Sequence, residues 1–339
     1  MQTKIKLPIT QPPITSHQFY ALPLAVMGAN KSSMNWVYSE FIQLVTHRER
    51  EEEYTNIRLY NNKNDQFVYE PLENITMASA KFLVQGRSIV DIYKNFLNNG
   101  HYIYDFVDKC YIKCLDIRNN FIHDLLIYGY DDEKNIFNVF VYNGLKLAEI
   151  EIPYEEYIAA YNSEYKIGRL NLTILYRRKE EEYKVDLRKI KWYLSDYING
   201  INTYNRENLH EVKLYKPQFG LNIYDELIYM FNFLYNLKMQ IRMADLYCFY
   251  EHKKLMTERI SYLRSNLNVR CTNELLNEFK SIEGECRKIV MLYIKMSQKN
   301  FNEQKDLEKL LAYIKEVREK EKIAYDGYFN LNKDIFNSL

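Results

Sequence analysis

His123 is the residue of this chain whose surroundings most clearly suggest chemistry. It opens an apolar run that includes residues 125–128, a polar and Asp-rich break covers residues 129–135, and a second apolar run follows at residues 136–142. Two such runs around such a break predict a β-hairpin. A histidine at the mouth of a hairpin can act as a general base when a nucleophile lies within reach.

The nucleophile expected for such a histidine is a cysteine on an earlier helix, yet the first cysteine of the chain is Cys110. Cys110 and Cys114 stand four residues apart on a predicted strand, so they share one face and are interpreted as core residues. Because no second Cys/His pair at ligand spacing accompanies them, we expect no metal and no cofactor. The five cysteines are scattered and odd in number, which predicts no disulfide framework.

The charge balance narrows the classes of partner. The 46 basic and 45 acidic residues leave a net charge of +1, whereas nucleic-acid binding normally needs a basic excess. No window approaches ~18 consecutive apolar residues, and the N-terminus lacks the apolar region of a signal peptide. We therefore expect a soluble cytoplasmic protein with no nucleic-acid or membrane partner; a homodimer stays open.

The elements that must position His123 follow from apolar spacing. An extended arm is expected over residues 1–15, then a helix over residues 17–29 that either starts near Leu22 or kinks at Pro23. Gly100 is expected just past the end of a second helix. Further helices are predicted over residues 88–97, 153–161 and 183–199, and strands over 101–117, 146–152 and 169–176.

The chain changes character near residue 218. Beyond it, apolar residues recur at three- and four-residue spacing with few strand signals, and Thr272 is a plausible helix N-cap. The predicted helices cover residues 222–238, 243–267, 272–299 and 303–323. We expect an α+β domain over residues 1–217 and a helical domain over residues 218–339.

Three segments resemble a known family. They are NNGHYI at residues 98–103 with Val107 and Asp108 after it, IHDLLIYGYD at residues 122–131, and EHKKLM at residues 251–256 followed by Arg259. They resemble proteins related to butirosin biosynthesis protein H and, more distantly, the peptidases that process double-glycine bacteriocin leaders. The resemblance implies a papain-like fold with an antiparallel sheet. It also implies acyl transfer from a carrier-protein thioester to an amine, by a cysteine at the start of the first helix.

The chain departs from the family where the cysteine should stand. That position falls near Ser16–Phe19, where Gln18 or Phe19 occupies it. Gln18 is no nucleophile, although its amide can donate a hydrogen bond to an oxyanion. The residue that orients the histidine should lie near residues 138–143, which offer Asn138 and Asn143, and cross-strand pairing favours Asn143.

Each candidate also has a structural interpretation. His123 is either a base or a buried, hydrogen-bonded histidine. Asn143, before a glycine, is typical of a turn. Ser16 can replace the missing nucleophile or serve as an N-cap. The residues around Glu251, His252, Asp245 and Arg242 form either a polar cluster or a solvated helix face, and we favour the solvated face.

The resemblance and the missing thiolate together predict a degenerate papain-like relative in nonribosomal natural-product biosynthesis. Such a protein would bind an acyl or peptidyl carrier protein, a peptide product or a biosynthetic partner enzyme. The alternative is an active acyltransferase, amide-forming enzyme or thioester hydrolase, which uses His123 with a non-cysteine nucleophile. The candidate site residues are His123, Asn143, Gln18 and Ser16.

Overall fold

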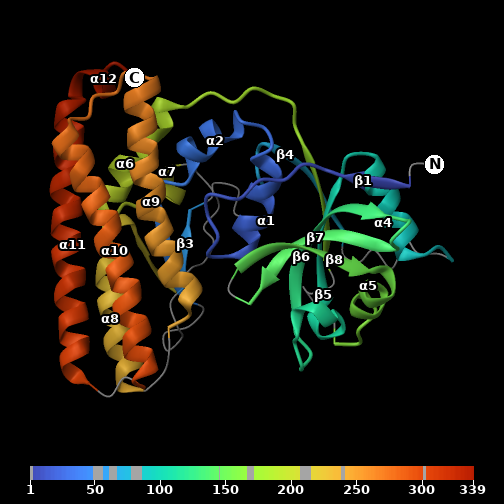
Figure 1. Cartoon of the computed structure of the whole chain (residues 1–339). Helices are drawn as coiled ribbons and strands as arrows, with labels where there is room; N and C mark the ends of the chain where they lie inside the picture. The colour runs from blue at the N-terminus through green and yellow to red at the C-terminus, as the bar shows by residue number, and fades with distance from the viewer. Residues whose placement is uncertain are drawn as a thin grey trace. The chain divides into compact units, whose positions relative to one another are not determined.

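The computed structural model describes residues 3–48, 56–60, 67–77, 86–144, 146–165, 172–206, 215–237, 241–300 and 303–339. The chain is an α+β protein with an antiparallel sheet and a helical C-terminal region (Figure 1). Its residue contacts divide it into a first unit, residues 1–33 and 66–182, and a second unit, residues 34–65 and 183–339. This division differs from the expected boundary after residue 217, because residues 34–65 and 183–217 group with the C-terminal helices.

Among the described residues, seven strands form the sheet of the first unit. The order is β4-β9-β5-β6-β7-β8, and β1 pairs with the far end of β6. Every neighbouring pair is antiparallel. The strands are β1 (Lys4–Lys6), β4 (Leu72–Met77), β5 (Tyr102–Asp108), β6 (Ile122–Asp131), β7 (Ile136–Asn143), β8 (Lys146–Pro153) and β9 (Thr173–Arg178).

The predicted hairpin around the Asp-rich break is confirmed as β6 and β7. The turn between them contains Asn135 with φ +56°, a conformation that asparagine tolerates. Gly129 does not break the strand, contrary to the expectation, because it lies inside β6 opposite Lys6 of β1. A Cβ on Gly129 would meet the Ile5 carbonyl oxygen at 2.5 Å, so glycine permits the close approach of β1.

Two helices pack on the sheet of the first unit in a common core. They are α4 (Ile89–Asn98) and α5 (Tyr154–Tyr161), and both were predicted. Ile103 and Val107 of β5 share this core with Leu125 and Ile127 of β6. The helix α4 is followed, as expected, by Gly100 in the left-handed region at φ +78°.

The N-terminal helix α1 (Gln18–Met27) contacts β6, β7 and β9. Pro23 lies inside it, so the predicted start near Leu22 is wrong. A proline has no N–H to offer the carbonyl four residues earlier, which is that of Phe19. The Tyr69 hydroxyl donates to this carbonyl at 2.5 Å and so satisfies it.

The second unit combines long helices with a small antiparallel sheet of order β10-β2-β3. The helices α8, α9, α10 and α11 lie side by side (Figure 1). The elements are α2 (Ser33–Glu40), β2 (Leu44–Arg48), β3 (Asn56–Leu59), α6 (Leu187–Asn199), α7 (Thr203–Arg206), β10 (Tyr215–Phe219), α8 (Ile223–Asn236), α9 (Met243–Asn266), α10 (Asn273–Gln298), α11 (Gln304–Leu331) and α12 (Lys333–Asn337).

Three of the four polar residues that were interpreted as a solvated helix face are buried, so that interpretation is wrong for them, whereas Arg242, just before α9, is exposed and pairs with Asp245 at 3.1 Å. Asp245, Glu251 and His252 are all buried. Arg259 donates to the carbonyl oxygens of Tyr38 (2.6 Å) and Phe41 (2.7 Å), and His252 Nε2 lies 2.7 Å from the Ile42 carbonyl oxygen. These side chains satisfy carbonyls at and after the C-terminal end of α2, which the helix itself leaves unpaired.

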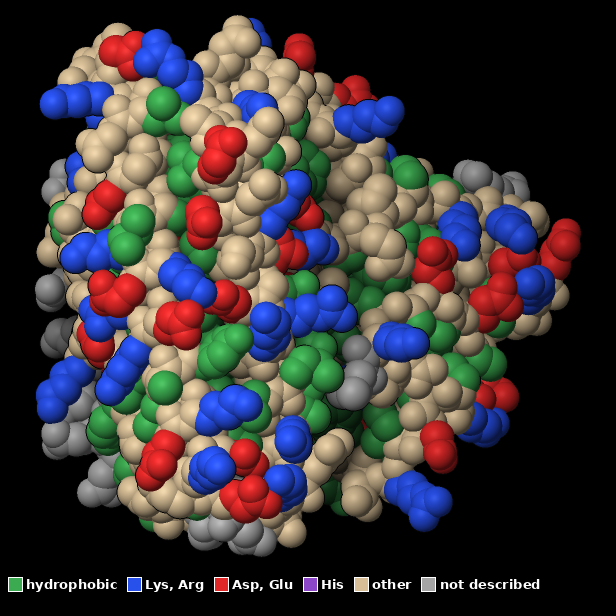
Figure 2. Space-filling model, turned by 60° about the vertical axis from the view of Figure 1, so that its left-hand side comes forward, with side chains coloured by type: hydrophobic (Ala, Val, Ile, Leu, Met, Phe, Trp, Pro, Cys, Tyr) green, Lys and Arg blue, Asp and Glu red, His purple; other side chains and the backbone are tan. Residues whose placement is uncertain are grey.

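The charged side chains on the surface and the apolar character of the helices can be compared with the sequence. Over the face shown in Figure 2, acidic and basic side chains are interspersed, as the net charge of +1 leads one to expect. Within the described residues, no helix combines the length and the apolar character that a membrane crossing requires.

Candidate functional site

The candidate site lies where the N-terminus of α1 meets the start of β6. Gln18 is the first residue of α1, and His123 is the second residue of β6. The side-chain amide of Gln18 lies 2.9 Å from His123 Nδ1. Two residues that are 105 positions apart in the chain therefore lie side by side.

Asp124 is the third member of this cluster. Its Oδ1 lies 2.5 Å from His123 Nδ1. With its amide nitrogen turned toward Asp124, Gln18 donates to the Asp124 carboxylate and, at 2.7 Å, to the Asp124 carbonyl oxygen. The Tyr104 hydroxyl donates to the other carboxylate oxygen, Oδ2. The carboxylate is thus held from two sides and can orient the imidazole of His123.

The exposure of the cluster is uneven. The His123 side chain is 39% exposed and that of Asp124 only 6%. His123 Nε2 has no hydrogen-bond partner among the described residues. Nδ1 faces the Asp124 carboxylate and also the Asp124 N–H at 3.1 Å, so in the tautomer that carries its proton on Nδ1 the Nε2 atom can accept a proton from an incoming group. The arrangement is chemically able to perform general-base catalysis.

A buried lysine accompanies the carboxylate. Lys109 is 1% exposed, and burial lowers the pKa of its amine to about 8, although the charge of Asp124 opposes that change. Its Nζ lies 6.0 Å from the ring centroid of Phe121. The Phe121 ring in turn stacks on His123 at a centroid distance of 4.9 Å. When protonated, Lys109 therefore adds a buried positive charge near the Phe121 ring that stacks on His123.

The two nearby cysteines do not supply an activated nucleophile. They lie in the 3-10 turns η1 (Lys109–Tyr111) and η2 (Lys113–Leu115), so the predicted strand over residues 101–117 ends early. Cys110 is half-buried and Cys114 is exposed, which corrects their interpretation as core residues. Burial and Asp108 raise the pKa of Cys110 to about 11, and the pKa of Cys114 is also raised, mainly by burial. Both thiols stay protonated at neutral pH.

Asn143 lies at the end of β7, near the expected position. The pairing of β6 with β7 ends at Leu126 and Phe140, three residues short of His123 and Asn143. Asn143 is exposed and precedes Gly144, whose φ is +61°. Among the described residues the hydrogen bonds of His123 go to Gln18 and Asp124. The orienting role of Asn143 stays a prediction.

The other two candidates fall at different places. Asn138 pairs with Gly129, six residues along β6 from His123, so it is not part of the cluster. Ser16 precedes the N-cap of α1, which is His17, so the N-cap interpretation of Ser16 is wrong. Its use as a nucleophile stays a prediction. Among the described residues, no three His, Cys, Asp or Glu side chains group closely enough to hold a metal ion.

Sequence reasoning missed Asp124 because it follows His123 directly. Neighbouring residues on a strand point to opposite faces, so the returning strand was the expected place for an orienting group. His123 and Asp124 are nevertheless in contact, with His123 Nδ1 2.5 Å from Asp124 Oδ1. A carboxylate directly after a strand-opening histidine was the available signal.

Comparison with known proteins adds no relative. Neither the models of protein families nor the curated protein sequences contain a significant match to this chain.

Proposed function

We propose that this chain is a degenerate relative of the papain-like acyltransferases, kept for binding rather than for thiolate chemistry. It would bind an acyl or peptidyl carrier protein, a peptide product or a partner enzyme of nonribosomal biosynthesis, in the cytoplasm. One observation carries the proposal. Gln18, the first residue of α1, contacts His123 near the start of β6, with its side-chain amide 2.9 Å from His123 Nδ1.

This juxtaposition is what a thiolate mechanism requires. A helix N-terminus carries about half a positive charge and, together with a neighbouring histidine, lowers the pKa of a cysteine. In this chain the same place holds an amide, which cannot attack a thioester. The amide instead donates to the Asp124 carboxylate. The replacement therefore removes the nucleophile and uses the position to hold the cluster together.

A second candidate function rests on the exposed Nε2 of His123. In direct transfer, an amine attacks the thioester carbon while His123 Nε2 takes its proton, and the carbon–sulfur bond breaks to release the thiol. Asp124 would stabilise the imidazolium that forms. This route needs no protein nucleophile, so the absence of a cysteine near Gln18 does not prevent it.

The sharpest test is Gln18→Cys. The change sets a thiol at the N-terminus of α1 beside His123, so we expect a covalent acyl adduct after incubation with an acyl-thioester-loaded carrier protein. Intact-protein mass spectrometry measures it. Gln18→Ala and the double variant Gln18→Cys/His123→Ala are the controls, and neither should acquire the adduct. A folded Gln18→Cys variant that stays unmodified would remove the main support for the proposal.

The unaltered protein separates the two candidate functions. An amide product or adduct that disappears in His123→Ala or in Ser16→Ala would establish an active enzyme. A stable complex with the loaded carrier protein in size-exclusion chromatography, without any product, would establish the binding role. Absence of both complex and product would reject both functions.

A further inference from the structure

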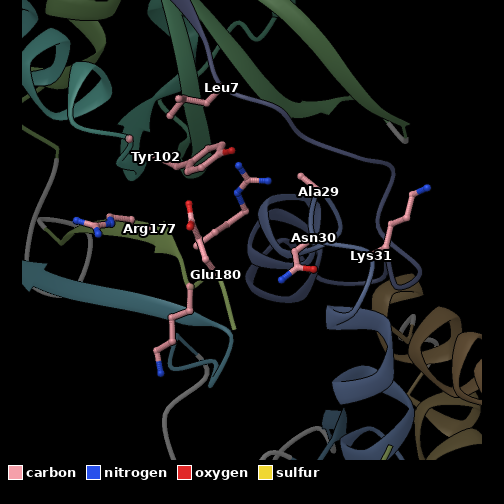
Figure 3. Close-up of a pocket in the computed structure, with 10 residues that line it drawn as sticks. Leu7, Ala29, Asn30, Lys31, Tyr102, Arg177 and Glu180 are labelled. Carbon is pink, nitrogen blue, oxygen red and sulfur yellow. The ribbon is translucent and has the colours of Figure 1, made fainter. Parts of the chain in front are cut away.

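We propose that a cavity at the carboxyl end of α1, in the first unit, binds a small multivalent anion such as a diphosphate or a phosphorylated metabolite. The cavity measures about 640 Å³ and is bounded by the end of β9, the residues after α1 and the start of β5 (Figure 3). All lining residues belong to the first unit. This volume lies in the usual range for small-molecule sites.

The lining is strongly basic for a chain with a net charge of +1. Four cationic side chains, those of Lys31, Arg177, Arg178 and Lys179, line the cavity with one carboxylate, that of Glu180. Because Glu73 pairs with Arg177, two positive charges remain in excess around the cavity. The carbonyl end of α1 adds at most about half a negative charge. Like charges gathered around one concave surface repel each other unless an anion joins them, and such a surface raises the local concentration of anions.

The partners of these cations are few. Arg177 forms an ion pair with Glu73, at 3.5 Å between Nε and Oε2. In the described residues, no carboxylate pairs with Lys31, Arg178 or Lys179. Lys31 and Arg177 are exposed and extend outward at the rim (Figure 3). They are placed to attract a ligand, whereas Arg178, which is half-buried, is placed to hold it.

Arg178 stands beside the aromatic wall of the cavity. Burial raises the pKa of Tyr102 to about 12, and the positive charge of Arg178 opposes that rise, so the two groups are close enough to interact. The Tyr102 hydroxyl donates to the Pro8 carbonyl oxygen at 2.6 Å, which fixes the ring. A guanidinium binds phosphate through two parallel hydrogen bonds, and the ring can pack on the rest of the ligand.

The cavity is separate from the Gln18–His123–Asp124 cluster. Gln18 begins α1, whereas Ala29 and Asn30, which line the cavity, follow its last turn. The ten residues of α1 correspond to a separation of roughly 15 Å. Binding at the cavity therefore does not depend on the function proposed for the cluster.

Isothermal titration of the full chain with inorganic pyrophosphate at low ionic strength tests the proposal. We expect saturable binding that weakens as salt is added, because exposed charges are screened. Acetate at the same ionic strength should bind far more weakly, since one negative charge meets fewer of the cations. No binding of pyrophosphate, or equal binding of acetate, would overturn the proposal.

Three variants locate the site. Arg178→Gln should weaken pyrophosphate binding by about tenfold or more, the usual loss for a hydrogen bond to a charged group. Lys31→Gln, which changes an exposed rim residue with little risk to folding, should weaken it by a few-fold. Arg118→Gln removes an exposed arginine of the same unit outside the cavity and should leave binding unchanged. Equal affinities in all three variants would place pyrophosphate elsewhere.

Discussion

Asp124 with His123 in the first unit and Glu321 with Lys253 in the second unit are both pairs of an acidic and a basic side chain, and the two pairs differ in their access to solvent. In the first unit the Asp124 carboxylate holds His123, whose side chain is 39% exposed. In the second unit Glu321 pairs with Lys253 at 2.9 Å, and both side chains are only 1% exposed. The first cluster can meet a ligand, whereas the second can act only on the fold.

The enclosed cluster is fully provided with partners. Glu321 accepts hydrogen bonds from the hydroxyls of Tyr197 (3.1 Å) and Tyr224 (2.6 Å). The Lys253 ammonium lies 4.6 Å from the ring centroid of Phe249, with the rings of Tyr197 and Tyr224 also near. Such a pair tolerates burial because every charge has a partner. The comparison teaches that exposure, more than residue type, separates a candidate site from a structural ion pair.

The largest effect is expected from Lys253→Met. Removal of the cation leaves Glu321 buried without its counter-charge, which costs about 3–5 kcal/mol of unfolding free energy. Chemical denaturation monitored by circular dichroism measures the change. The double variant Lys253→Met/Glu321→Gln should recover part of the loss. A single variant as stable as the unaltered protein would show that the enclosed pair does not support the fold.

Lys109→Met should increase the unfolding free energy, whereas Lys253→Met lowers it. The reason is that, in the described residues, no carboxylate pairs with Lys109 within ion-pair distance. Burial lowers its pKa in the folded state to about 8, from 10.5. Between these values the unfolded chain binds more protons, so the stability contributed by this group rises with pH. The cost of the buried charge, at most about 3 kcal/mol, is present in full below pH 8.

The measurement is the difference in unfolding free energy between Lys109→Met and the unaltered protein, from pH 7 to pH 10. The variant should be more stable at pH 7, and its advantage should shrink as the pH approaches 10. Lys134→Met, which removes an exposed lysine of the same unit, is the control and should show no such trend. A constant difference for Lys109→Met would contradict the lowered pKa.

Asp124→Asn tests whether the carboxylate of the exposed pair supports the chemistry of His123. An amide cannot stabilise an imidazolium as a carboxylate does, so any acylation that depends on His123 should slow by about a hundredfold. The rate of adduct formation in the Gln18→Cys background measures it. Asn143→Ala in the same background is the matched control and separates the two orienting residues. If Asn143→Ala slowed acylation more than Asp124→Asn, the orienting role would belong to Asn143.

The smallest change in stability is expected from the hydrogen bonds of Asp108, which pairs with Ile122, the residue before His123. Burial acts to raise the pKa of Asp108, but hydrogen bonds from Asn120, the Phe121 N–H and Ser163 outweigh this and lower it to about 2. A carboxyl with a pKa below its unfolded value of 3.8 contributes stability that is present above that value and is lost as the pH falls through about 2. Asn120→Ala should cost about 1 kcal/mol at neutral pH.

Acid unfolding distinguishes this contribution from a general surface effect. The acid midpoint should move to higher pH in Asn120→Ala and stay in place in Asn119→Ala, which changes the exposed neighbour. Equal midpoints in the two variants would show that the bond from Asn120 Nδ2 to Asp108, at 2.7 Å, contributes nothing to the lowered pKa.

The sequence by itself determined the elements whose signals are local. The four long C-terminal helices follow from apolar spacing, and Thr272 accepts a hydrogen bond from the Leu275 N–H at 3.1 Å as the predicted N-cap. The hairpin and the glycine after α4 follow from turn chemistry. Each signal lies within a few residues of the structure that it specifies, so no knowledge of the fold is needed.

Only the tertiary structure decided how distant segments combine. The small sheet joins β2 and β3 to β10, which follows them by more than 150 residues, and β1, at residues 4–6, pairs with residues 129–131 of β6. The polar residues of α9 look solvated in the sequence, yet Arg259 and His252 are buried because they satisfy carbonyls near the end of α2. The contact between Gln18 and Asp124 likewise joins two segments that are remote in the sequence. Pairing between remote segments depends on the closure of long loops and on shape, neither of which leaves a periodic mark in the sequence.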